Sequence, residues 1–313
     1  MRARLIVNPK SGTDRAPALL PLINERLRTL VTELDVTITT SEQDVVTAAL
    51  RAAQEQRDLL FVAGGDGTLN VALRGLVGDA LDRITIGVLP FGTGNDFVKA
   101  LDLGEDPEAA LDAMLACRTI DVDVGFVNDR PFVNTSSGGF VADVSAVLTE
   151  GLKDAAGKLA FVIGGARVIF GTEPFSARVT LPGASGAVAD DPLDLQMFVV
   201  CNARYIGGGY PIAQDALIDD GLLDTFLVRR TTTLEFVALL QRIAAGEHAA
   251  DDRILHFRAR EFVLDFDRTV RVNTDGELLT GERCHYHLLA RAARFLCGPR
   301  PHATARPRPL VES

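Results

Sequence analysis

An apolar run that breaks into a glycine-rich turn constrains this chain more than any other stretch. Residues 59–63 (LLFVA) form a continuous apolar segment of strand length, as expected for a parallel strand covered on both faces. Residues 64–68 (GGDGT) follow at once, and glycine lets the backbone turn sharply there. From Leu69 onward, leucines recur at helical spacing. The stretch predicts a strand, a tight turn and a helix in direct succession.

A turn of this kind is suited to phosphate, because backbone amides in the turn and at the helix N-terminus point toward an incoming anion. The alternative is an ordinary strand–helix connection that happens to contain glycine. Two more polar, glycine-bearing turns follow predicted strands, at residues 8–12 (NPKSG) and 90–96 (PFGTGND). Three similar turns favour the binding site over the plain connection.

The alternation of strands and helices up to about residue 118 predicts a parallel, doubly wound α/β sheet. In such sheets ligands lie outside the carboxyl ends of the strands. The loops that carry Asn8, Thr40, residues 64–68 and residues 92–96 are therefore expected to converge on one cleft. Thr40 is also expected to cap the helix that follows it.

From about residue 119 the pattern changes to short alternating segments, which are typical of an antiparallel β domain. We expect an α/β domain over residues 1–120 and a β-rich, sandwich-like domain over residues 121–290. A helical insertion is expected at residues 143–170. The proline- and arginine-rich residues 299–313 are expected to form a disordered tail.

The formal net charge of −10 argues against nucleic acid as a partner, because phosphate-backbone binding needs a basic face. A local patch could still dock on a membrane, and its candidates are Arg229, Arg230, Arg258 and Arg260. Scattered cysteines, with no signal peptide and no membrane-length apolar run, favour a cytoplasmic protein. An exposed β edge could pair two subunits into a homodimer.

The glycine-rich loops do not match two common nucleotide motifs. The chain has neither GxGxxG nor GxxxxGK[ST], so a dinucleotide fold of the first type and a P-loop enzyme are both disfavoured. What remains are small residues, the acids Asp66 and Asp96, and several hydroxyls. Amides and hydroxyls can cradle a triphosphate, and an acid can hold the Mg²⁺ that neutralises it.

Seven motifs occur in one order along almost the whole chain: NPKSG (8–12), GGDGTLN (64–70), PFGTGNDF (90–97), SSGGF (136–140), CNARYIGGGYPIA (201–213), LIDDGLLD (217–224) and NTDGE (273–277). This set resembles the diacylglycerol kinase catalytic-domain family, in particular its bacterial lipid kinases, which are relatives of sphingosine and ceramide kinases. GGDGT alone is shared with NAD kinases, so the later motifs make the resemblance specific.

The resemblance implies an ATP-dependent lipid kinase that uses Mg²⁺ and transfers the γ-phosphoryl group to a lipid hydroxyl at the membrane surface. Diacylglycerol is the first candidate acceptor, and phosphatidic acid would be the product. It also implies that residues 291–298 return to the first domain. The residues expected to bind nucleotide are Asn8, Thr40, Gly64, Gly65, Asp66, Gly67, Thr68, Leu69, Asn70, Thr93 and Asn95.

Two acids are expected to be catalytic, Asp66 and Glu277. Glu277 ends the NTDGE motif and corresponds to the family's general base, which would accept the proton of the lipid hydroxyl. The alternative for Glu277 is a hairpin-turn carboxylate, because Asp275-Gly276 is itself a turn signal.

The LIDDGLLD motif resembles a structural Mg²⁺ loop. By the resemblance, Asp220 supplies the carboxylate, and Leu217 and Leu222 supply carbonyl oxygens, which are hard ligands suited to magnesium. Relatives have proline just upstream where this chain has Gln214, which leaves Asp215 as another candidate ligand.

Three alternatives to a diacylglycerol kinase stay open. The acceptor could be another lipid, such as a sphingoid base, ceramide or phosphatidylglycerol. The chain could be a NAD kinase, although LIDDGLLD and the final DGE are not expected there. It could also be a non-catalytic nucleotide-binding regulator, against which the intact Asp66 and Glu277 argue.

Overall fold

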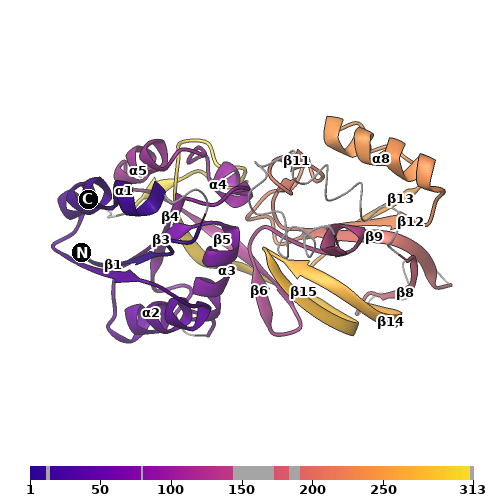
Figure 1. Ribbon diagram of the computed structural model, residues 1–313, viewed down its shortest axis with the longest axis horizontal. Helices are drawn as coiled ribbons and strands as arrows, with labels where there is room; N and C mark the ends of the chain where they lie inside the picture. The colour runs from indigo at the N-terminus through magenta and orange to yellow at the C-terminus, as the bar shows by residue number, and fades with distance from the viewer. Residues whose placement is uncertain (12–14, 79, 144–172, 183–190, 311–313) are drawn as a thin grey trace. The chain divides into compact units, whose positions relative to one another are not determined.

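The computed structural model describes residues 1–11, 15–78, 80–143, 173–182 and 191–310 (Figure 1). It divides into two compact units, and β5 and β15 each contribute residues to both of them. Unit 1 comprises Met1–Val124, Leu217–Asp220 and Leu289–Ser313, and unit 2 comprises Gly125–Ala216 and Gly221–Leu288. The helical insertion expected at residues 143–170 lies, except for its first residue, outside the described part of the chain.

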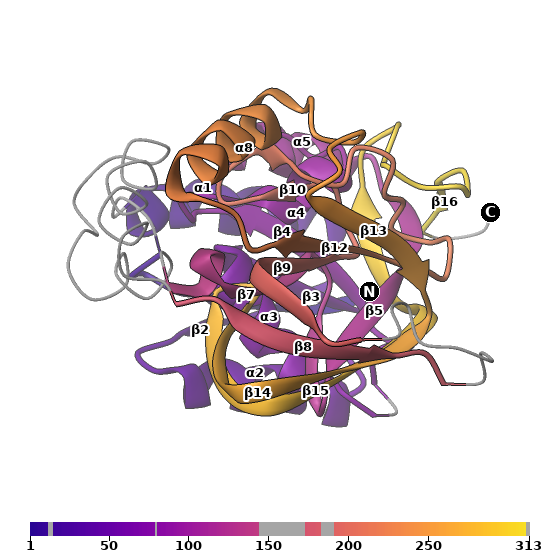
Figure 2. The ribbon, with the colours of Figure 1, turned by 90° about the vertical axis from the view of Figure 1, so that its right-hand side faces the viewer.

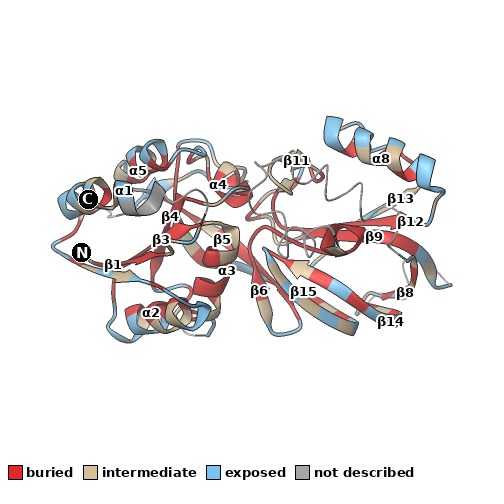
Figure 3. Ribbon diagram, viewed as in Figure 1, coloured by how far each residue is buried: buried red, intermediate tan, exposed pale blue. Residues whose placement is uncertain are grey.

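Unit 1 is built on a parallel sheet with the strand order β2-β1-β3-β4. Its strands are β1 (Arg2–Val7), β2 (Glu33–Ile38), β3 (Leu59–Gly64) and β4 (Thr85–Pro90). Every residue of β3 and β4 is buried, which explains why these strands read as continuous apolar runs (Figure 3). The carboxyl ends of the strands carry the loops predicted to bind a ligand.

The described residues of this unit form five helices: α1 (Arg15–Leu30), α2 (Glu42–Gln54), α3 (Asp66–Arg74), α4 (Asp96–Ala100) and α5 (Pro107–Leu115). The N-cap of α2 is Ser41, which forms a capping box with Asp44. The expectation that Thr40 caps this helix was therefore wrong by one residue. Thr40 instead binds the Asp44 carboxylate from outside the helix.

The C-terminal segment packs on unit 1 rather than forming a free tail. The end of β15 (Glu277–Cys297) pairs in parallel with β4, and β16 (Arg308–Pro309) pairs with β5 (Arg118–Val127). Between them, the backbone amide of His302 donates to the Ala100 carbonyl at 2.8 Å. The expectation of disorder was wrong for residues 299–310, because their polar groups are hydrogen-bonded to unit 1 although they bury little apolar surface.

Unit 2 is an antiparallel β structure, so the expected combination of a parallel α/β part and an antiparallel β part is confirmed. Its strand β9 (Leu193–Cys201) pairs with β7, β8 and β12. The other elements among its described residues are β6 (Arg130–Phe132), β7 (Thr135–Gly139), β8 (Phe175–Thr180), β10 (Tyr205–Ile206), β11 (Tyr210–Pro211), β12 (Leu223–Arg229), α8 (Thr233–Ala245), β13 (Ile254–Ala259), β14 (Glu261–Thr274) and the first part of β15.

Two hydrophobic clusters lie on the two faces of β9 and β12. Alternate residues of these strands point to opposite faces, so Phe198 and Leu227 join one cluster while Val199 and Phe226 join the other. The second cluster is closed by α8, which contributes Phe236, Leu239 and Ile243 and lies along these strands in Figure 2. Among the described residues, no helix combines the length and apolar character needed to cross a membrane.

Candidate active site

The loops after β1 and β3 in unit 1 are joined through one hydroxyl. Thr68 Oγ1 accepts a hydrogen bond from Asn8 Nδ2 at 2.9 Å and lies 3.1 Å from Ser11 Oγ. The backbone amide of Asn8 also donates to the Ala63 carbonyl at 3.0 Å. The structure thus brings together Asn8, Ser11 and Thr68 at one edge of the sheet, which joins two of the four loops expected to converge there.

Gly64 and Gly65 of the GGDGT loop have no room for a side chain, because Thr68 and the loop after β4 lie against them. A Cβ on Gly64 would lie 2.5 Å from the Thr68 side chain, and one on Gly65 would lie 3.0 Å from Gly92 Cα in the loop after β4. The Phe91 amide donates to the Gly64 carbonyl at 2.9 Å, which joins the same two loops. From the sequence, these glycines were expected to let the backbone turn sharply, and the structure adds this contact between loops.

Asp66 ties the GGDGT loop to α4. Its carboxylate accepts hydrogen bonds from the backbone amides of Asp96 at 3.0 Å and Phe97 at 3.3 Å, which are the first amides of that helix. Burial, together with the neighbouring charge of Asp96, raises the pKa of Asp66 to about 6. A cation near Asp66 would favour the charged form of this acid and lower its pKa.

Lys99 completes this group and was not among the residues singled out from the sequence. Its ammonium lies 3.0 Å from Asp96 Oδ1 and 3.3 Å from the Gly94 carbonyl, and it is partly buried. A lysine three residues after Asp96 on a short helix was the available sequence signal. Such a cation beside a glycine-rich loop can attract the phosphates of a nucleotide.

The other expected nucleotide residues occupy different environments. Asn95 has a left-handed backbone, and its side chain both accepts from the Gly92 amide at 2.9 Å and donates to the Gly92 carbonyl at 2.6 Å, so it shapes the loop. Thr93 and Thr40 are exposed. The side chain of Leu69 is buried in the core, which leaves its backbone as the group that can face a ligand. Asn70 is also buried on α3, and Gly67 lies in the first turn of that helix.

Glu277 lies in unit 2, at the start of β15 and directly after the hairpin turn Asp275-Gly276. It is partly buried and pairs with Thr274 across the hairpin. The Asp275-Gly276 turn that the sequence indicated is therefore present, and Glu277 follows it directly as the first residue of β15. Asp275 was noted only as a turn residue, but its side chain is buried and accepts hydrogen bonds from backbone amides of residues 133–135.

The expected structural metal ligands are divided between the units: Leu217 and Asp220 belong to unit 1 and Leu222 to unit 2. The neighbouring Asp219 is buried and accepts hydrogen bonds from Thr304 and Ala305 of the C-terminal segment. Asp219 is therefore used for folding, and Asp220 stays the expected carboxylate. Carboxylate and carbonyl oxygens are donors that suit Mg²⁺. Within the described ranges, no cluster of three or more His, Cys, Asp or Glu side chains could hold a metal ion.

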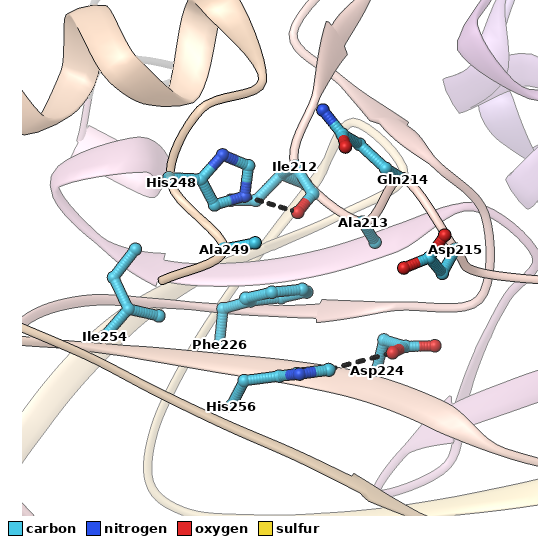
Figure 4. A pocket seen from close by; sticks show the side chains of 10 residues that line it. All are labelled: Ile212, Ala213, Gln214, Asp215, Asp224, Phe226, His248, Ala249, Ile254 and His256. Carbon is cyan, nitrogen blue, oxygen red and sulfur yellow. Dashed lines mark hydrogen bonds and ion pairs between the residues drawn. The ribbon is translucent and has the colours of Figure 1, made fainter. Parts of the chain in front are cut away.

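Gln214 and Asp215 line a small pocket of unit 2 formed with β12, β13 and the segment after α8 (Figure 4). Gln214 Nε2 donates to the carbonyl of Gly246, the C-cap of α8, at 2.7 Å. Through this contact the Gln214 amide fastens the loop to the helix. In the same pocket Phe226 stacks on His256, which binds Asp224 at 2.9 Å.

The two histidines on one face of β15 find separate partners. His285 Nε2 lies 2.8 Å from Glu261 Oε1, and His287 stacks on Phe126 with the ring centroids 4.9 Å apart. Burial and the charge of His285 lower the pKa of His287. Such contacts are typical of side chains on the polar face of a strand.

A glycine-loop α/β unit followed by a β-sandwich-like unit defines a class of kinases, and the comparisons with known proteins place the chain in it. Residues 2–127 match the model of the diacylglycerol kinase catalytic domain, and residues 135–294 match the YegS C-terminal NAD kinase beta sandwich-like domain. The chain belongs to the diacylglycerol kinase catalytic-domain family of lipid kinases.

Relatives of this family span nearly the full chain. A protein of Bacillus subtilis named diacylglycerol kinase is 30% identical over 90% of this chain and 92% of its own length. A protein of Shewanella frigidimarina named "Probable lipid kinase YegS-like" is 29% identical over 95% of this chain and 94% of its own. The crystal structure of a diacylglycerol kinase from Bacillus anthracis has a TM-score of 0.77 at 26% identity, covering 95% of this chain and 97% of that one.

The fold is also shared with NAD kinases. The crystal structure of an NAD kinase from Archaeoglobus fulgidus in complex with ATP has a TM-score of 0.53 at 14% identity and covers 96% of both chains. At this identity the likeness concerns the fold alone.

Proposed function

We propose that this chain transfers the γ-phosphoryl group of ATP to a hydroxyl of a membrane lipid, with diacylglycerol as the acceptor and phosphatidic acid as the product. The observation that carries the proposal is the match of both units, in order, to the two domains of one lipid-kinase family. The name of the Bacillus subtilis relative supports diacylglycerol as the acceptor.

In unit 1, the turn before α3 and the first amides of that helix are suited to hold the ATP phosphates. Thr68, held by Asn8, keeps the loop in shape, and Lys99 adds a positive charge beside it. Asp66 is the proposed carboxylate ligand of a Mg²⁺ ion, which would neutralise phosphate charge during transfer. Leu217, Asp220 and Leu222 are the proposed residues of a second, structural Mg²⁺ site.

In unit 2, Glu277 is the proposed general base. It accepts the proton of the lipid hydroxyl while the hydroxyl oxygen forms a bond to the γ-phosphorus and the bond from phosphorus to the ADP oxygen breaks. A carboxylate at a fixed hairpin end is suited to this task, because proton acceptance depends on correct placement of the base.

A lipid acceptor requires transient contact with a membrane surface. The net charge of −10 means that such contact depends on a local basic patch rather than on the whole molecule. Arg229 and Arg230 are exposed at the end of β12 and suit this role. Arg258 suits it less well, because its guanidinium lies 3.3 Å from Asp224 Oδ1.

A second candidate acceptor is another lipid, and the YegS-like relative supports it. The test is transfer of labelled phosphate from ATP to a panel of detergent-dispersed lipids: diacylglycerol, monoacylglycerol, sphingosine, ceramide and phosphatidylglycerol, with NAD as a soluble acceptor. Magnesium-dependent labelling of diacylglycerol above all others is the expected result. Labelling of a different lipid would keep the chemistry and change the acceptor, and labelling of NAD alone would overturn the proposal.

A further inference from the structure

Asp275 holds three consecutive backbone amides with one carboxylate. Its Oδ2 accepts hydrogen bonds from the amides of Val133 at 2.8 Å and Asn134 at 3.2 Å, and its Oδ1 accepts one from the amide of Thr135 at 2.7 Å. The backbone amide of Asp275 donates in return to the Thr135 carbonyl at 2.9 Å. These residues are about 140 positions apart in the chain, and Asp275 is only 5% exposed.

The same residue forms the turn that precedes Glu277. Asp275 and Gly276 both have positive φ, 48° and 94°, as in the two-residue turns that join antiparallel strands. Asn273 Oδ1 accepts a hydrogen bond from the Gly276 amide at 2.8 Å, which closes the turn. Glu277 follows as the first residue of β15. Only Gly276 separates the buried anchor from the proposed base.

The segment of residues 133–135, which Asp275 binds, forms further hydrogen bonds within unit 2. Asn202 Nδ2 donates to the Val133 carbonyl at 2.8 Å, and the Asn202 backbone amide donates to the Asn134 carbonyl at 2.9 Å. Asn134 Nδ2 donates to the Tyr205 carbonyl at 3.2 Å. Three motifs, VNTSS, CNARY and NTDGE, therefore meet at this point in unit 2. The hairpin end is therefore hydrogen-bonded to a buried segment.

We propose that Asp275 is a positioning residue: its carboxylate fixes the end of the β14–β15 hairpin so that Glu277 is held in a catalytically competent place. The inference rests on the proposed role of Glu277 as general base. An ionised carboxylate can accept from all three amides, whereas the amide group of an asparagine would turn one donor toward these N–H groups. Acceptor atoms at both ends of the carboxylate, and not only the shape of Asp275, are therefore required.

The test is a double-mutant cycle with Asp275→Asn and Glu277→Gln, assayed by labelled-phosphate transfer to diacylglycerol. Asp267→Asn is the matched control, because Asp267 lies on β14, the strand that leads into the turn, and also accepts a backbone amide, that of Ser176 at 2.9 Å, but is exposed and lies outside the turn. Each variant is measured for kcat, for KM toward ATP and lipid, for ATP affinity and for thermal stability.

We expect Asp275→Asn to lower kcat by roughly 10- to 100-fold, since a misplacement of about 1 Å can cost that much, with the affinity for ATP unchanged. In the Glu277→Gln background, Asp275→Asn should cost nothing further, because the residue that it positions is already disabled. Asp267→Asn should keep full kcat. An unchanged kcat in Asp275→Asn, or an equal additional loss in the Glu277→Gln background, would overturn the proposal.

Full turnover in Glu277→Gln would show instead that the base is assigned wrongly, and the role of Asp275 would be overturned with it. If Asp275→Asn does not fold, Asn273→Ala carries the test. It removes the bond that closes the turn and leaves the Asp275 carboxylate in place. A loss of kcat that disappears in the Glu277→Gln background supports positioning of Glu277 by the hairpin, and an unchanged kcat contradicts it.

Discussion

Gly65 and Gly92 lie so close that the backbones of two loops touch: a Cβ on Gly92 would come within 2.5 Å of Gly65 Cα. The loop after β4 thus supports the loop after β3 directly. The shape of the proposed phosphate site depends on both glycines, although they lie in different sequence motifs.

Gly92→Ala should therefore weaken ATP binding by pushing the two loops apart. Overpacking at a backbone contact costs about 1–3 kcal/mol, which corresponds to a loss of affinity of roughly 10- to 100-fold. Calorimetric titration with ATP and Mg²⁺ measures it. Gly281→Ala is the control, because a Cβ there meets its nearest neighbour at an ordinary 3.4 Å. Equal ATP affinity in wild type and Gly92→Ala would show that the loop contact is dispensable.

Thr68→Val should lower both stability and ATP affinity. The change keeps the volume that covers Gly64 but removes the oxygen that accepts from Asn8 and bonds to Ser11. Leaving these polar groups without that partner costs about 1–3 kcal/mol. Thermal unfolding and ATP titration measure the two effects, and Thr68→Ser, which keeps the hydroxyl, should lie close to wild type. If serine and valine behave alike, the hydroxyl is not the important group.

The raised pKa of Asp66 predicts a pH-dependent stability. Its folded-state pKa of about 6 lies above the ordinary value of 3.8, so the folded protein binds this proton more tightly than the unfolded chain does. The contribution of Asp66 to stability is most favourable below about pH 4, falls as the pH rises to about 6, and stays lower above it. The shift corresponds to at most about 3 kcal/mol.

Asp66→Asn removes this titration. The melting temperature of the variant relative to wild type should therefore rise between pH 4 and pH 7, measured without nucleotide or magnesium, while kinase activity is lost. Asp82→Asn, at an exposed position of the same unit, should run parallel to wild type. Parallel curves for Asp66→Asn as well would contradict the assigned pKa shift.

Thr304→Val tests whether the C-terminal segment stabilises unit 1. Thr304 donates from its hydroxyl and its backbone amide to the buried carboxylate of Asp219. Loss of the hydroxyl bond to a charged acceptor should cost about 1.5–3 kcal/mol of unfolding free energy. Chemical denaturation measures this, with exposed Arg306→Ala as the control. A stability equal to wild type would mean that the segment is held by other contacts.

Much of the fold was predictable because local patterns determine it. The buried runs of β3 and β4 and the glycine turns after them made the parallel unit visible in the sequence. The ordered segment 299–310 was missed because its composition is rich in proline and arginine, and its support comes from hydrogen bonds to residues far away in the chain. Asp275 was noted only as a turn former for the same reason. Its partners are backbone amides about 140 residues earlier, and the sequence does not show which backbone amides a side chain will bind.

Phosphate transfer from labelled ATP to diacylglycerol by wild type, Glu277→Gln and Glu282→Gln tests most directly whether the chain is a lipid kinase with Glu277 as its general base. Glu282 is a matched control, because it is an exposed glutamate on the same strand that bonds Thr269. Wild type and Glu282→Gln should label diacylglycerol in a magnesium-dependent reaction, and Glu277→Gln should bind ATP equally well but lose nearly all transfer. Wild-type protein that binds ATP and labels no lipid, or a Glu277→Gln variant with full turnover, would contradict this account.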